Sequence, residues 1–412
     1  MRYIAARLVI TLVLIAFPVW TASAQTLTVL HTFSGGTDGG SPESALTMDS
    51  GGHLYGTALK GADGYGTVYK MTDEHGSWLF TNIYNFQGDS GNNDGAGPIA
   101  KVVIGPNGSL YGTTVAGGGD PNGNCADYGY FGCGTVYNLQ PPQSVCKSVS
   151  CPWHETQLLQ MVNGPGGIYP FGAVAFDHAG DIYGTTNLGS GLGTVYELTH
   201  SSGGWAASTL VSFTGSNGGE PYDTLVLDSS GSLYGTAVGG GANGYGVVFE
   251  LSPTESGWTE TILHSFTNTD GNKPYGGLIF DSAGNLYGAT SSGGSGNGGT
   301  VFELSPSGGS WQFNVLYNLA GTYEFGPQDS LTMDSAANLY GTTLGGGANS
   351  LGTVFKLTHS GNDWVYSDLY DFSAGADGCE PNGGVVLDSQ GNIYGATTSC
   401  ADGYGTVWKL TQ

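Results

Sequence analysis

The sequence predicts an all-β fold, a seven-bladed β-propeller of four-stranded antiparallel blades. Glycine accounts for 75 of the 412 residues and only 10% of the residues are charged, a composition that excludes helical bundles and coiled coils. A tandem unit of about 50 residues recurs along the chain. The last copy of this unit lacks its fourth strand, and a matching strand stands at the N-terminus. A chain arranged in this way closes into a ring rather than an open solenoid.

The repeat is marked by Tyr-Gly-Thr or Tyr-Gly-Ala, with a proline thirteen residues before each tyrosine. The spacing is the same in every copy, which chance does not produce. The tyrosines are Tyr55, Tyr111, Tyr183, Tyr234, Tyr287, Tyr340 and Tyr394, and the prolines are Pro42, Pro98, Pro170, Pro221, Pro274, Pro327 and Pro381. Seven copies predict seven blades.

Each unit divides into four short strands separated by turn residues. An apolar run such as Leu278–Phe280 predicts a first strand that is buried on both faces, and Asp281–Asn285 predicts the hairpin turn after it. Leu-Tyr-Gly-Thr forms the second strand, and a glycine-rich loop leads to a third strand such as Gly352–Leu357. A tryptophan opens the fourth strand, as in Trp258–Phe266. We expect the repeated aspartates, tyrosines and tryptophans to be turn and packing residues.

The two ends of the chain predict how the ring closes. The last unit stops at the end of its third strand, Val407–Leu410, while Leu30–Phe33 matches the fourth strand Leu263–Phe266 of another unit. We therefore expect residues 26 to 33 to pair as the outer strand of the sheet formed by residues 384 to 411. Closure of this kind removes the sheet edges that an open stack would have to cap.

Residues 1 to 24 predict an export signal. Arg2 and Arg7 precede an apolar run from Leu8 to Trp20, and Ala22-Ser23-Ala24 follows as a cleavage site. A membrane anchor is the alternative, but the run is shorter than the ~20 residues of a spanning helix. We expect a secreted or periplasmic protein in which residues 25–412 form a single propeller domain, with insertions in blade two at about 117–133 and 140–152.

The charge of the chain excludes two classes of partner. Without residues 1 to 24 it has seven lysines and no arginine against 33 acidic residues, a net charge of −26. Nucleic acids and anionic membrane surfaces bind through basic clusters, so neither is expected as a partner. We expect a monomer that binds carbohydrate or an extracellular protein and does not insert into a membrane after signal cleavage.

The unit Pro-x-x-x-Leu-x-x-Asp-x-x-Gly-Asn-Leu-Tyr-Gly-Thr-Thr, followed by Gly-Thr-Val-Phe-Glu/Lys-Leu, resembles the bacterial tandem repeat called GloVer, after Gloeobacter and Verrucomicrobia. Residues 276–304 and 329–357 match it most closely. The resemblance implies an exported repeat protein, found beside varied C-terminal anchors, with no catalytic residues to carry over. Because this sequence ends at Gln412 without such an anchor, we expect release rather than attachment to the cell surface.

The face that carries the blade-to-blade crossings is the expected binding face, because in a propeller these crossings converge on the mouth of the central channel. Carboxylates gather next to the repeat prolines, among them Glu43 and Asp223. Aromatic rings beside carboxylates suit carbohydrate, although crossings of this length also carry turn and packing residues. Lys101 is the only charged residue at its position in the repeat and is expected to point into the channel. The predicted ligand-binding residues are Glu220, Tyr222, Tyr275, Asp329, Glu380, Tyr169 and Lys101.

Two functions fit these residues. The first is a non-catalytic exported propeller that binds carbohydrate or another extracellular component. The alternative is a propeller hydrolase or lyase acting on polysaccharide through paired carboxylates or a bound cation. The histidines are scattered and no Gly-x-Ser-x-Gly elbow is present, so we favour binding. No cofactor is expected. The one candidate calcium loop, Asp120-x-Asn122-x-Asn124, lacks the glycine and the glutamate of such loops.

The six cysteines predict three disulfides in the oxidising compartment that the signal implies. Cys125 with Cys133 and Cys146 with Cys151 would each form within one insertion of unit two. Cys379 and Cys400 lie in a crossing and in a loop that the propeller places on the same face.

Overall fold

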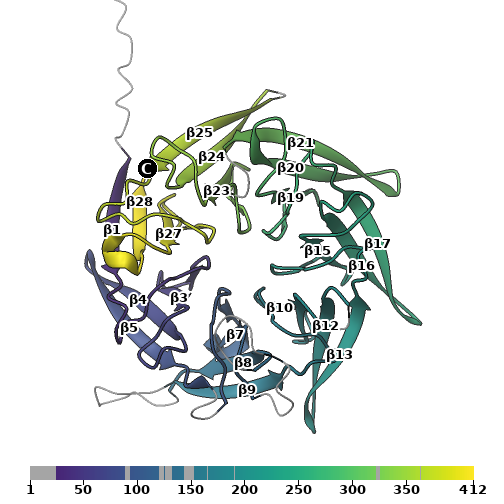
Figure 1. The fold of residues 1–412 in the computed structure, drawn as a ribbon, viewed down its shortest axis with the longest axis horizontal. Coiled ribbons are helices and arrows are strands. Elements are labelled where there is room, and N and C mark those ends of the chain that lie inside the picture. The colour runs from purple at the N-terminus through teal and green to yellow at the C-terminus, as the bar shows by residue number, and fades with distance from the viewer. Residues whose placement is uncertain are drawn as a thin grey trace, which may run out of the picture.

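The computed structural model describes residues 25–88, 93–119, 125, 132–142, 153–164, 166–189, 191–321, 325–361 and 363–412. They form seven antiparallel sheets of four strands, arranged radially as the blades of a β-propeller (Figure 1). Two short 3₁₀ turns, Pro106–Gly108 and Ala401–Gly403, are the helical elements of this part of the chain. None of its helices is long and apolar enough to cross a membrane. The predicted fold class is confirmed.

From the axis outward, each of the first six blades uses four consecutive strands. Blade 1 contains β2 (Thr47–Met48), β3 (Leu54–Ala58), β4 (Thr67–Glu74) and β5 (Ser77–Asn85). Blade 2 contains β6 (Val103–Ile104), β7 (Leu110–Thr114), β8 (Thr135–Gln140) and β9 (His154–Gln160). Blade 3 contains β10 (Ala175–Phe176), β11 (Ile182–Thr186), β12 (Thr194–Ser201) and β13 (Gly204–Ser212).

The second half of the ring repeats this order. Blade 4 contains β14 (Val226–Leu227), β15 (Leu233–Ala237), β16 (Val247–Thr254) and β17 (Gly257–Ser265). Blade 5 contains β18 (Ile279–Phe280), β19 (Leu286–Ala289), β20 (Asn297–Ser307) and β21 (Ser310–Ala320). Blade 6 contains β22 (Thr332–Met333), β23 (Leu339–Thr343), β24 (Thr353–Ser360) and β25 (Asp363–Asp371). Blade 7 contains β26 (Val386–Leu387), β27 (Ile393–Thr397), β28 (Thr406–Thr411) and, from the other end of the chain, β1 (Thr26–Thr32).

Blade 7 closes the ring as predicted. Strand β1 pairs antiparallel with β28, with Thr26 opposite Thr411 and Thr32 opposite Thr406. In Figure 1 the N-terminal strand lies at the rim beside the last strand of the chain. The first residues of the propeller therefore complete the sheet formed by the last ones. Strand β28 is paired on both sides, with β27 and β1, and does not form an open edge.

The innermost strands differ from the prediction. The apolar runs were expected to be strands buried on both faces, but each innermost strand has only two residues, and these are half-buried, as in β18. Leu278, just before β18, is 1% exposed. The prediction of full burial was wrong because these strands line the central channel, which leaves one of their sides without a covering layer.

The repeated aspartates are turn residues, as the sequence predicts. The Asp281 carboxylate accepts hydrogen bonds from the Ala283 and Asn285 amides, and the Tyr287 hydroxyl donates to its second oxygen at 3.2 Å. The same tyrosine-to-aspartate bond is found in six blades, between Tyr55 and Asp49, Tyr183 and Asp177, Tyr234 and Asp228, Tyr287 and Asp281, Tyr340 and Asp334, and Tyr394 and Asp388. The tyrosine of the motif thus holds the hairpin turn that precedes it.

The other two residues of the motif join strands and blades. A Cβ on Gly56 would lie 2.3 Å from the Tyr69 hydroxyl, because the ring from the paired third strand covers this glycine. The Thr57 hydroxyl donates to the Ala100 carbonyl of the next blade at 3.0 Å. Equivalent threonine bonds link blades 2 to 3, 3 to 4, 4 to 5 and 6 to 7. The motif therefore contributes to the interface between neighbouring blades as well as to its own sheet.

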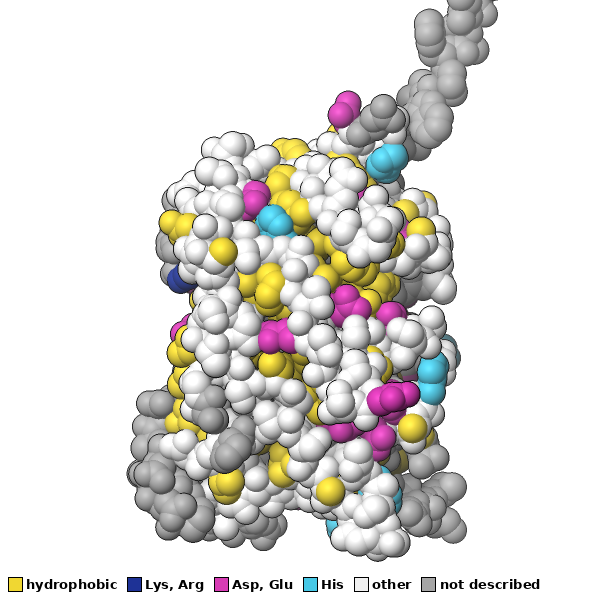
Figure 2. Space-filling model, turned by 90° about the vertical axis from the view of Figure 1, so that its right-hand side faces the viewer, with side chains coloured by type: hydrophobic (Ala, Val, Ile, Leu, Met, Phe, Trp, Pro, Cys, Tyr) yellow, Lys and Arg dark blue, Asp and Glu magenta, His cyan; other side chains and the backbone are white. Residues whose placement is uncertain are grey.

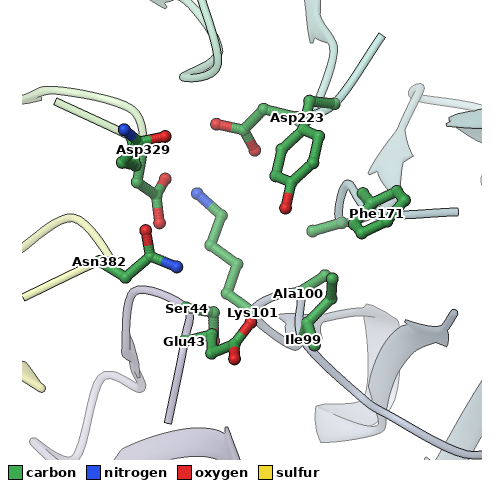
Figure 3. A pocket seen from close by; sticks show the side chains of 12 residues that line it. Glu43, Ser44, Ile99, Ala100, Lys101, Phe171, Asp223, Asp329 and Asn382 are labelled. Carbon is green, nitrogen blue, oxygen red and sulfur yellow. The ribbon is translucent and has the colours of Figure 1, made fainter. Parts of the chain in front are cut away.

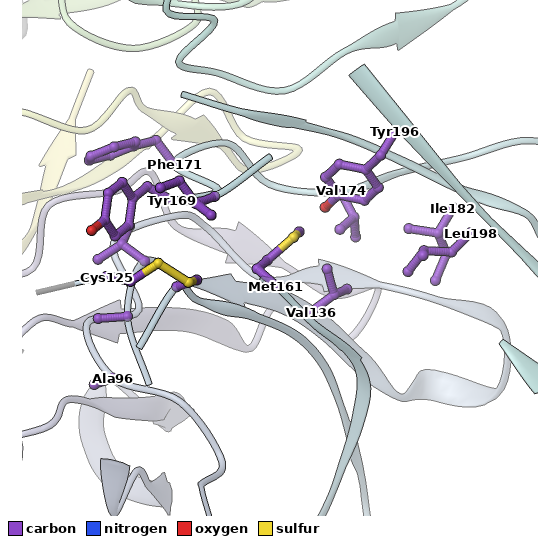
Figure 4. Close-up of a cluster of buried hydrophobic side chains, with 14 residues drawn as sticks. Ala96, Cys125, Val136, Met161, Tyr169, Phe171, Val174, Ile182, Tyr196 and Leu198 are labelled. Carbon is purple, nitrogen blue, oxygen red and sulfur yellow. A yellow bond between two sulfur atoms is a disulfide. The ribbon is translucent and has the colours of Figure 1, made fainter. Parts of the chain in front are cut away.

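The hydrophobic core is divided among the contacts between neighbouring blades. Figure 4 shows one such cluster, in which residues of blades 2 and 3 surround Tyr169, Phe171 and a disulfide. Tryptophans of the fourth strands pack against motif tyrosines of the preceding blade, as Trp258 does on Tyr183 with ring centroids 6.0 Å apart. The predicted packing role of these aromatic residues is confirmed.

Two of the predicted disulfides are present. Cys125 pairs with Cys133, with Cα atoms 5.1 Å apart, and Cys379 pairs with Cys400 at 5.4 Å. The backbone of Cys379 also forms a bridge with Ser399. This places the crossing and the loop on one face, as predicted. Cys146 and Cys151, most of both predicted insertions, and the candidate calcium loop at Asp120, Asn122 and Asn124 lie outside the described residues.

We expect non-reducing peptide mapping to recover both of these pairs. The Cys379→Ser/Cys400→Ser double variant should lose about 3 kcal/mol of unfolding free energy, because the disulfide closes a loop with a sequence separation of 21 residues in the unfolded chain. Urea unfolding with and without reductant measures this loss. Reductant should not change the double variant if Cys125 and Cys133, 0% and 1% exposed, are protected in the fold. A peptide joining Cys379 to Cys125 would contradict the pairing.

Candidate functional site

A small cavity lies at the mouth of the central channel, on the face that carries the crossings. Its volume is about 50 Å³, enough for one or two water molecules or a small cation. The polar side chains that line it stand between the repeat proline and the innermost strand of their blades. They are Glu43 and Ser44 of blade 1, Lys101 of blade 2, Tyr222 and Asp223 of blade 4, Gln328 and Asp329 of blade 6 and Asn382 of blade 7. Figure 3 shows Lys101 between Asp223, Asp329, Asn382 and Glu43.

Asp223 and Asp329 connect blades across this mouth. Asp223 Oδ2 accepts hydrogen bonds from the Gly277 amide of blade 5 at 2.6 Å and from the Ser330 hydroxyl of blade 6 at 2.8 Å. Asp329 Oδ2 accepts from the Gly384 amide of blade 7 at 2.9 Å and from the Ala45 amide of blade 1 at 3.1 Å. Two carboxylates thereby join five of the seven blades.

The ammonium group of Lys101 points into the mouth, toward these two carboxylates (Figure 3). Burial and, to a smaller extent, the nearby Asp223 carboxylate raise the pKa of Asp329 to about 6, although the Lys101 charge and the amides that bond to the carboxylate oppose this shift. Asp329 keeps some exposed surface, but the protein groups around the mouth surround it closely, which explains the effect of burial. In the described residues the ion pairs within 4 Å are those of His31 with Asp38 and His264 with Asp270, so Lys101 acts on Asp329 from a longer distance.

Glu43 is a second carboxyl group of the cavity whose protonation is favoured. Burial raises its pKa above the ordinary value, and the Lys60 ammonium partly offsets this shift. The mouth therefore combines one lysine with carboxyl groups that take up protons more readily than exposed ones. When protonated, such groups can donate hydrogen bonds to a neutral polar ligand, and their oxygens can also accept hydrogen bonds from it.

Three aromatic rings from successive blades form an arc beside the cavity. The Phe171 and Tyr222 rings stack with centroids 4.5 Å apart, and Tyr222 meets Tyr275 edge to face at 5.1 Å. Phe171 is 6% exposed, whereas Tyr222 and Tyr275 are half-buried. We call Phe171, Tyr222 and Tyr275 the aromatic arc. The exposed parts of the two tyrosine rings lie next to the polar side chains that line the cavity.

The predicted site residues divide into two groups. Lys101, Tyr222 and Asp329 line one cavity, and Tyr275 contacts Tyr222. Tyr169, Glu220 and Glu380 instead share one repeat position, the residue before the proline, where φ lies between 56° and 59°. The amide of this residue donates to the loop of the preceding blade, as from Glu220 to Leu192 at 2.7 Å. One such residue per blade is held by its backbone, so the three do not form one site.

Their side chains also differ. Tyr169 is 2% exposed and belongs to the core cluster of blades 2 and 3, so it has almost no surface for a ligand. Glu380 accepts a hydrogen bond from the Ser399 hydroxyl at 2.6 Å, beside the disulfide, and Glu220 is exposed. We leave these three residues out of the candidate site.

Sequence reasoning missed Gln328 and Asn382, which complete the lining of the cavity. Each directly follows its repeat proline, the position that Glu43 and Tyr222 also occupy in their units. Comparing the residue after each proline would have selected them. In the part of the chain that the structure describes, no three His, Cys, Asp or Glu residues lie close enough together to hold a metal ion.

Residues 123–343 match the family model described as the Gloeobacter/Verrucomicrobia repeat. The chain belongs to this family. The match covers more than half of the sequence and confirms the resemblance read from the repeat unit. No curated protein sequence matches the chain significantly.

Solved structures share its fold at low sequence identity. A polysaccharide lyase of family PL25, an ulvan lyase, superposes with a TM-score of 0.56 and 13% identity over 89% of this chain and 92% of its own. A structure of a PL25 ulvan lyase bound to -[GlcA(1-4)Rha3S]- superposes with a TM-score of 0.55 and 13% identity, over 90% of this chain and 94% of the lyase chain. The extracellular domain of BT4673 from B. thetaiotaomicron, described as a one-component system, gives 0.55 and 14% over 93% of this chain. This chain spans 40% of the length of that protein. At these identities the likeness shows the fold alone.

Proposed function

We propose that this protein is an exported, non-catalytic propeller that binds carbohydrate at the mouth of its central channel. The observation that carries the proposal is the aromatic arc, in which Tyr222 and Tyr275 stand half-exposed beside a cavity lined by amide, carboxyl and ammonium groups. Aromatic rings pack against the apolar faces of sugars, while such polar groups bond to hydroxyls. The net charge of −26 without residues 1 to 24 favours a neutral or cationic polymer.

The hydrogen bonds of the two aspartates favour binding over catalysis. Both oxygens of Asp329 accept backbone amides, and Asp223 accepts amides and a hydroxyl. A carboxylate held in this way would have to break contacts between blades in order to act as a base or nucleophile. The alternative, a polysaccharide hydrolase or lyase, is favoured by one observation, the raised pKa of Asp329 near Lys101.

Export is supported by the disulfides. Disulfides persist in oxidising compartments and are rare in the cytosol. Two are present in the described residues, one of them buried between blades 2 and 3 (Figure 4). Acidic side chains are scattered over the side of the ring shown in Figure 2, with no basic patch there to attract a polyanion. We place the protein in the periplasm or outside the cell.

The Tyr222→Ala/Tyr275→Ala variant should bind carbohydrate at least several-fold more weakly than the parent. Stacking on such rings contributes about 1 kcal/mol beyond the buried area, by analogy with aromatic pairs. A panel of neutral oligosaccharides on an array, followed by calorimetry on the best binder, measures the loss. The Tyr222→Phe/Tyr275→Phe variant is the matched control, since it keeps both rings and removes only the hydroxyls.

Two outcomes would contradict the proposal. Unchanged binding by the alanine variant, together with a loss of several kcal/mol of stability, would mean that the tyrosines serve only packing. Release of reducing ends, or of unsaturated sugars detected by ultraviolet absorbance, from any polysaccharide on the panel would favour the enzyme. Catalysis of this kind should then disappear in Lys101→Met.

A further inference from the structure

Blade 2 departs from the repeat at two positions next to its motif tyrosine, Tyr111. Six blades have aspartate in the hairpin turn, and blade 2 has Gly105. Opposite the motif tyrosine, on the third strand, six blades have a charged residue, and blade 2 has Asn138. The six charged residues are Lys70, Glu197, Glu250, Glu303, Lys356 and Lys409.

The two replacements remove the partners that hold this tyrosine elsewhere. Tyr183 donates to Glu197 at 3.0 Å, and the Lys356 ammonium lies 5.1 Å from the centre of the Tyr340 ring. For Tyr111 the described residues supply neither a carboxylate partner nor a lysine. The other motif tyrosines are 3–7% exposed, whereas Tyr111 is half-buried.

Gly105 makes room for a different position of the ring. Its φ is −85°, which any residue adopts, so the backbone does not require glycine. A Cβ at this position would lie 2.3 Å from Tyr111 Cε2. The Tyr111 ring therefore lies over residue 105 and meets the Phe176 ring of blade 3 edge to face, with centroids 4.8 Å apart. An aspartate at position 105 would exclude the ring from this place.

A groove of about 490 Å³ lies between blades 2 and 3, beside the Tyr111 ring. At five other blade interfaces the motif tyrosine contacts the tryptophan of the next blade, at centroid distances of 5.7 to 6.4 Å. The structure records no such contact between Tyr111 and Trp205. Both line the groove with Phe176, Asn138, Gln140 and Thr156, and no Asp, Glu, Lys or Arg is among its described lining residues.

We propose that this groove is a second binding site, and that it takes a neutral carbohydrate chain. Its volume lies within the range of about 300–1,000 Å³ of small-molecule sites, and rings with a few amides and a hydroxyl match the mixed surface of a sugar. Pro106 and Gly180 of its lining belong to hairpin turns, and His200 lies at the end of β12 next to another, on the face opposite the crossings. The site is therefore separate from the channel mouth and does not depend on the function proposed there.

The paired substitution Gly105→Asp/Asn138→Glu tests the inference by giving blade 2 the residues of its neighbours. The variant should return Tyr111 to the buried position, narrow the groove and place two charges in it. We expect at least tenfold weaker binding of the groove's ligand among three probes, cellohexaose, laminarihexaose and mannohexaose, by calorimetry. The melting temperature should be equal to or above that of the parent, which separates loss of the site from misfolding.

Two further variants complete the design. Ser256→Glu/Ser307→Asp adds two acidic groups at exposed positions of blades 4 and 5 and should leave binding unchanged. Tyr222→Ala/Tyr275→Ala should also leave binding at the groove unchanged, whatever it does at the channel mouth. Trp205 gives a direct signal, since its fluorescence should change on titration and this change should be absent in Trp205→Phe.

The inference is overturned if the parent binds none of the three probes at millimolar concentration, or if Gly105→Asp/Asn138→Glu binds them as the parent does. Loss of all binding in Tyr222→Ala/Tyr275→Ala alone would uphold the channel mouth and refute the groove. Loss in Gly105→Asp/Asn138→Glu alone would uphold the groove and refute the mouth.

Discussion

Removal of residues 25–35 should abolish the cooperative thermal unfolding of the propeller. These residues contain β1, whose register with β28 runs from Thr26–Thr411 to Thr32–Thr406. They also contain Phe33, which is 0% exposed and packs in the core between blades 7 and 1, its ring 5.4 Å from that of Tyr69. Their loss leaves a cavity in this core and exposes β28 as an open edge. Circular dichroism of the chain from residue 36 onward, against the chain from residue 25, measures the effect.

A peptide added in trans separates loss of closure from general damage. A synthetic peptide of residues 25–35 should restore a cooperative transition in proportion to its concentration, because it binds only the folded ring. A peptide of the same composition in scrambled order is the control. Closure by β1 would be refuted if the shortened chain melted at the same temperature and with the same cooperativity as the longer one.

The repeat made the architecture predictable from the sequence. Seven identical spacings between proline and tyrosine set the number of blades, and the displaced fourth strand showed which end completes the ring. The pairing of Cys379 with Cys400 followed from the same geometry. Each of these predictions needs only the order of strands along the chain, which short local patterns determine.

The composition of the site was less predictable, because side-chain direction depends on local backbone geometry. Tyr169, Glu220 and Glu380 stand close in sequence to the residues of the mouth, but they share a left-handed backbone and an amide bond to the preceding blade, and none of them lines the cavity. Three residues later in the repeat, Asp223 and Asp329 accept hydrogen bonds from the following blades around the channel. Periodicity gives positions in the repeat, and it does not give the direction in which each side chain points.

Gly105 illustrates a second limit. In a sequence with 75 glycines, a single glycine in a turn stands out only as an exception to the aspartate pattern of the other units. Its effect depends on the ring of Tyr111, six residues later, which occupies the space that a Cβ would need. A break in the repeat becomes informative when two breaks, here Gly105 and Asn138, meet at one side chain.

Replacing Lys101 with methionine should make the stability of the propeller fall more steeply between pH 4 and pH 7. Burial and the Asp223 carboxylate raise the pKa of Asp329 to about 6, above the ordinary value of about 3.9, so between these two pH values the folded state holds a proton that the unfolded state has released. The stabilising contribution of this group is therefore complete below about pH 4 and is lost as the pH rises through about 6. Lys101 lowers this pKa, so its loss should shift the decline to higher pH.

The size of the effect follows from linkage. For Asp329 alone, a shift of about two pKa units corresponds to about 3 kcal/mol between pH 4 and pH 7 in the parent, and Lys101→Met should increase this difference. Urea unfolding at several pH values measures this difference, and carbon NMR of the Asp329 carboxyl follows the pKa itself.

Lys356→Met is the matched control, because it removes a lysine charge that lies at a tyrosine ring of blade 6, and it should leave the dependence of stability on pH unchanged. Identical profiles for parent and Lys101→Met would show that the lysine does not act on Asp329. Asp329→Asn, which removes the carboxyl that joins blades 6, 7 and 1, should decline less than the parent, and the decline that remains would come from other carboxyl groups with a raised pKa, such as Glu43.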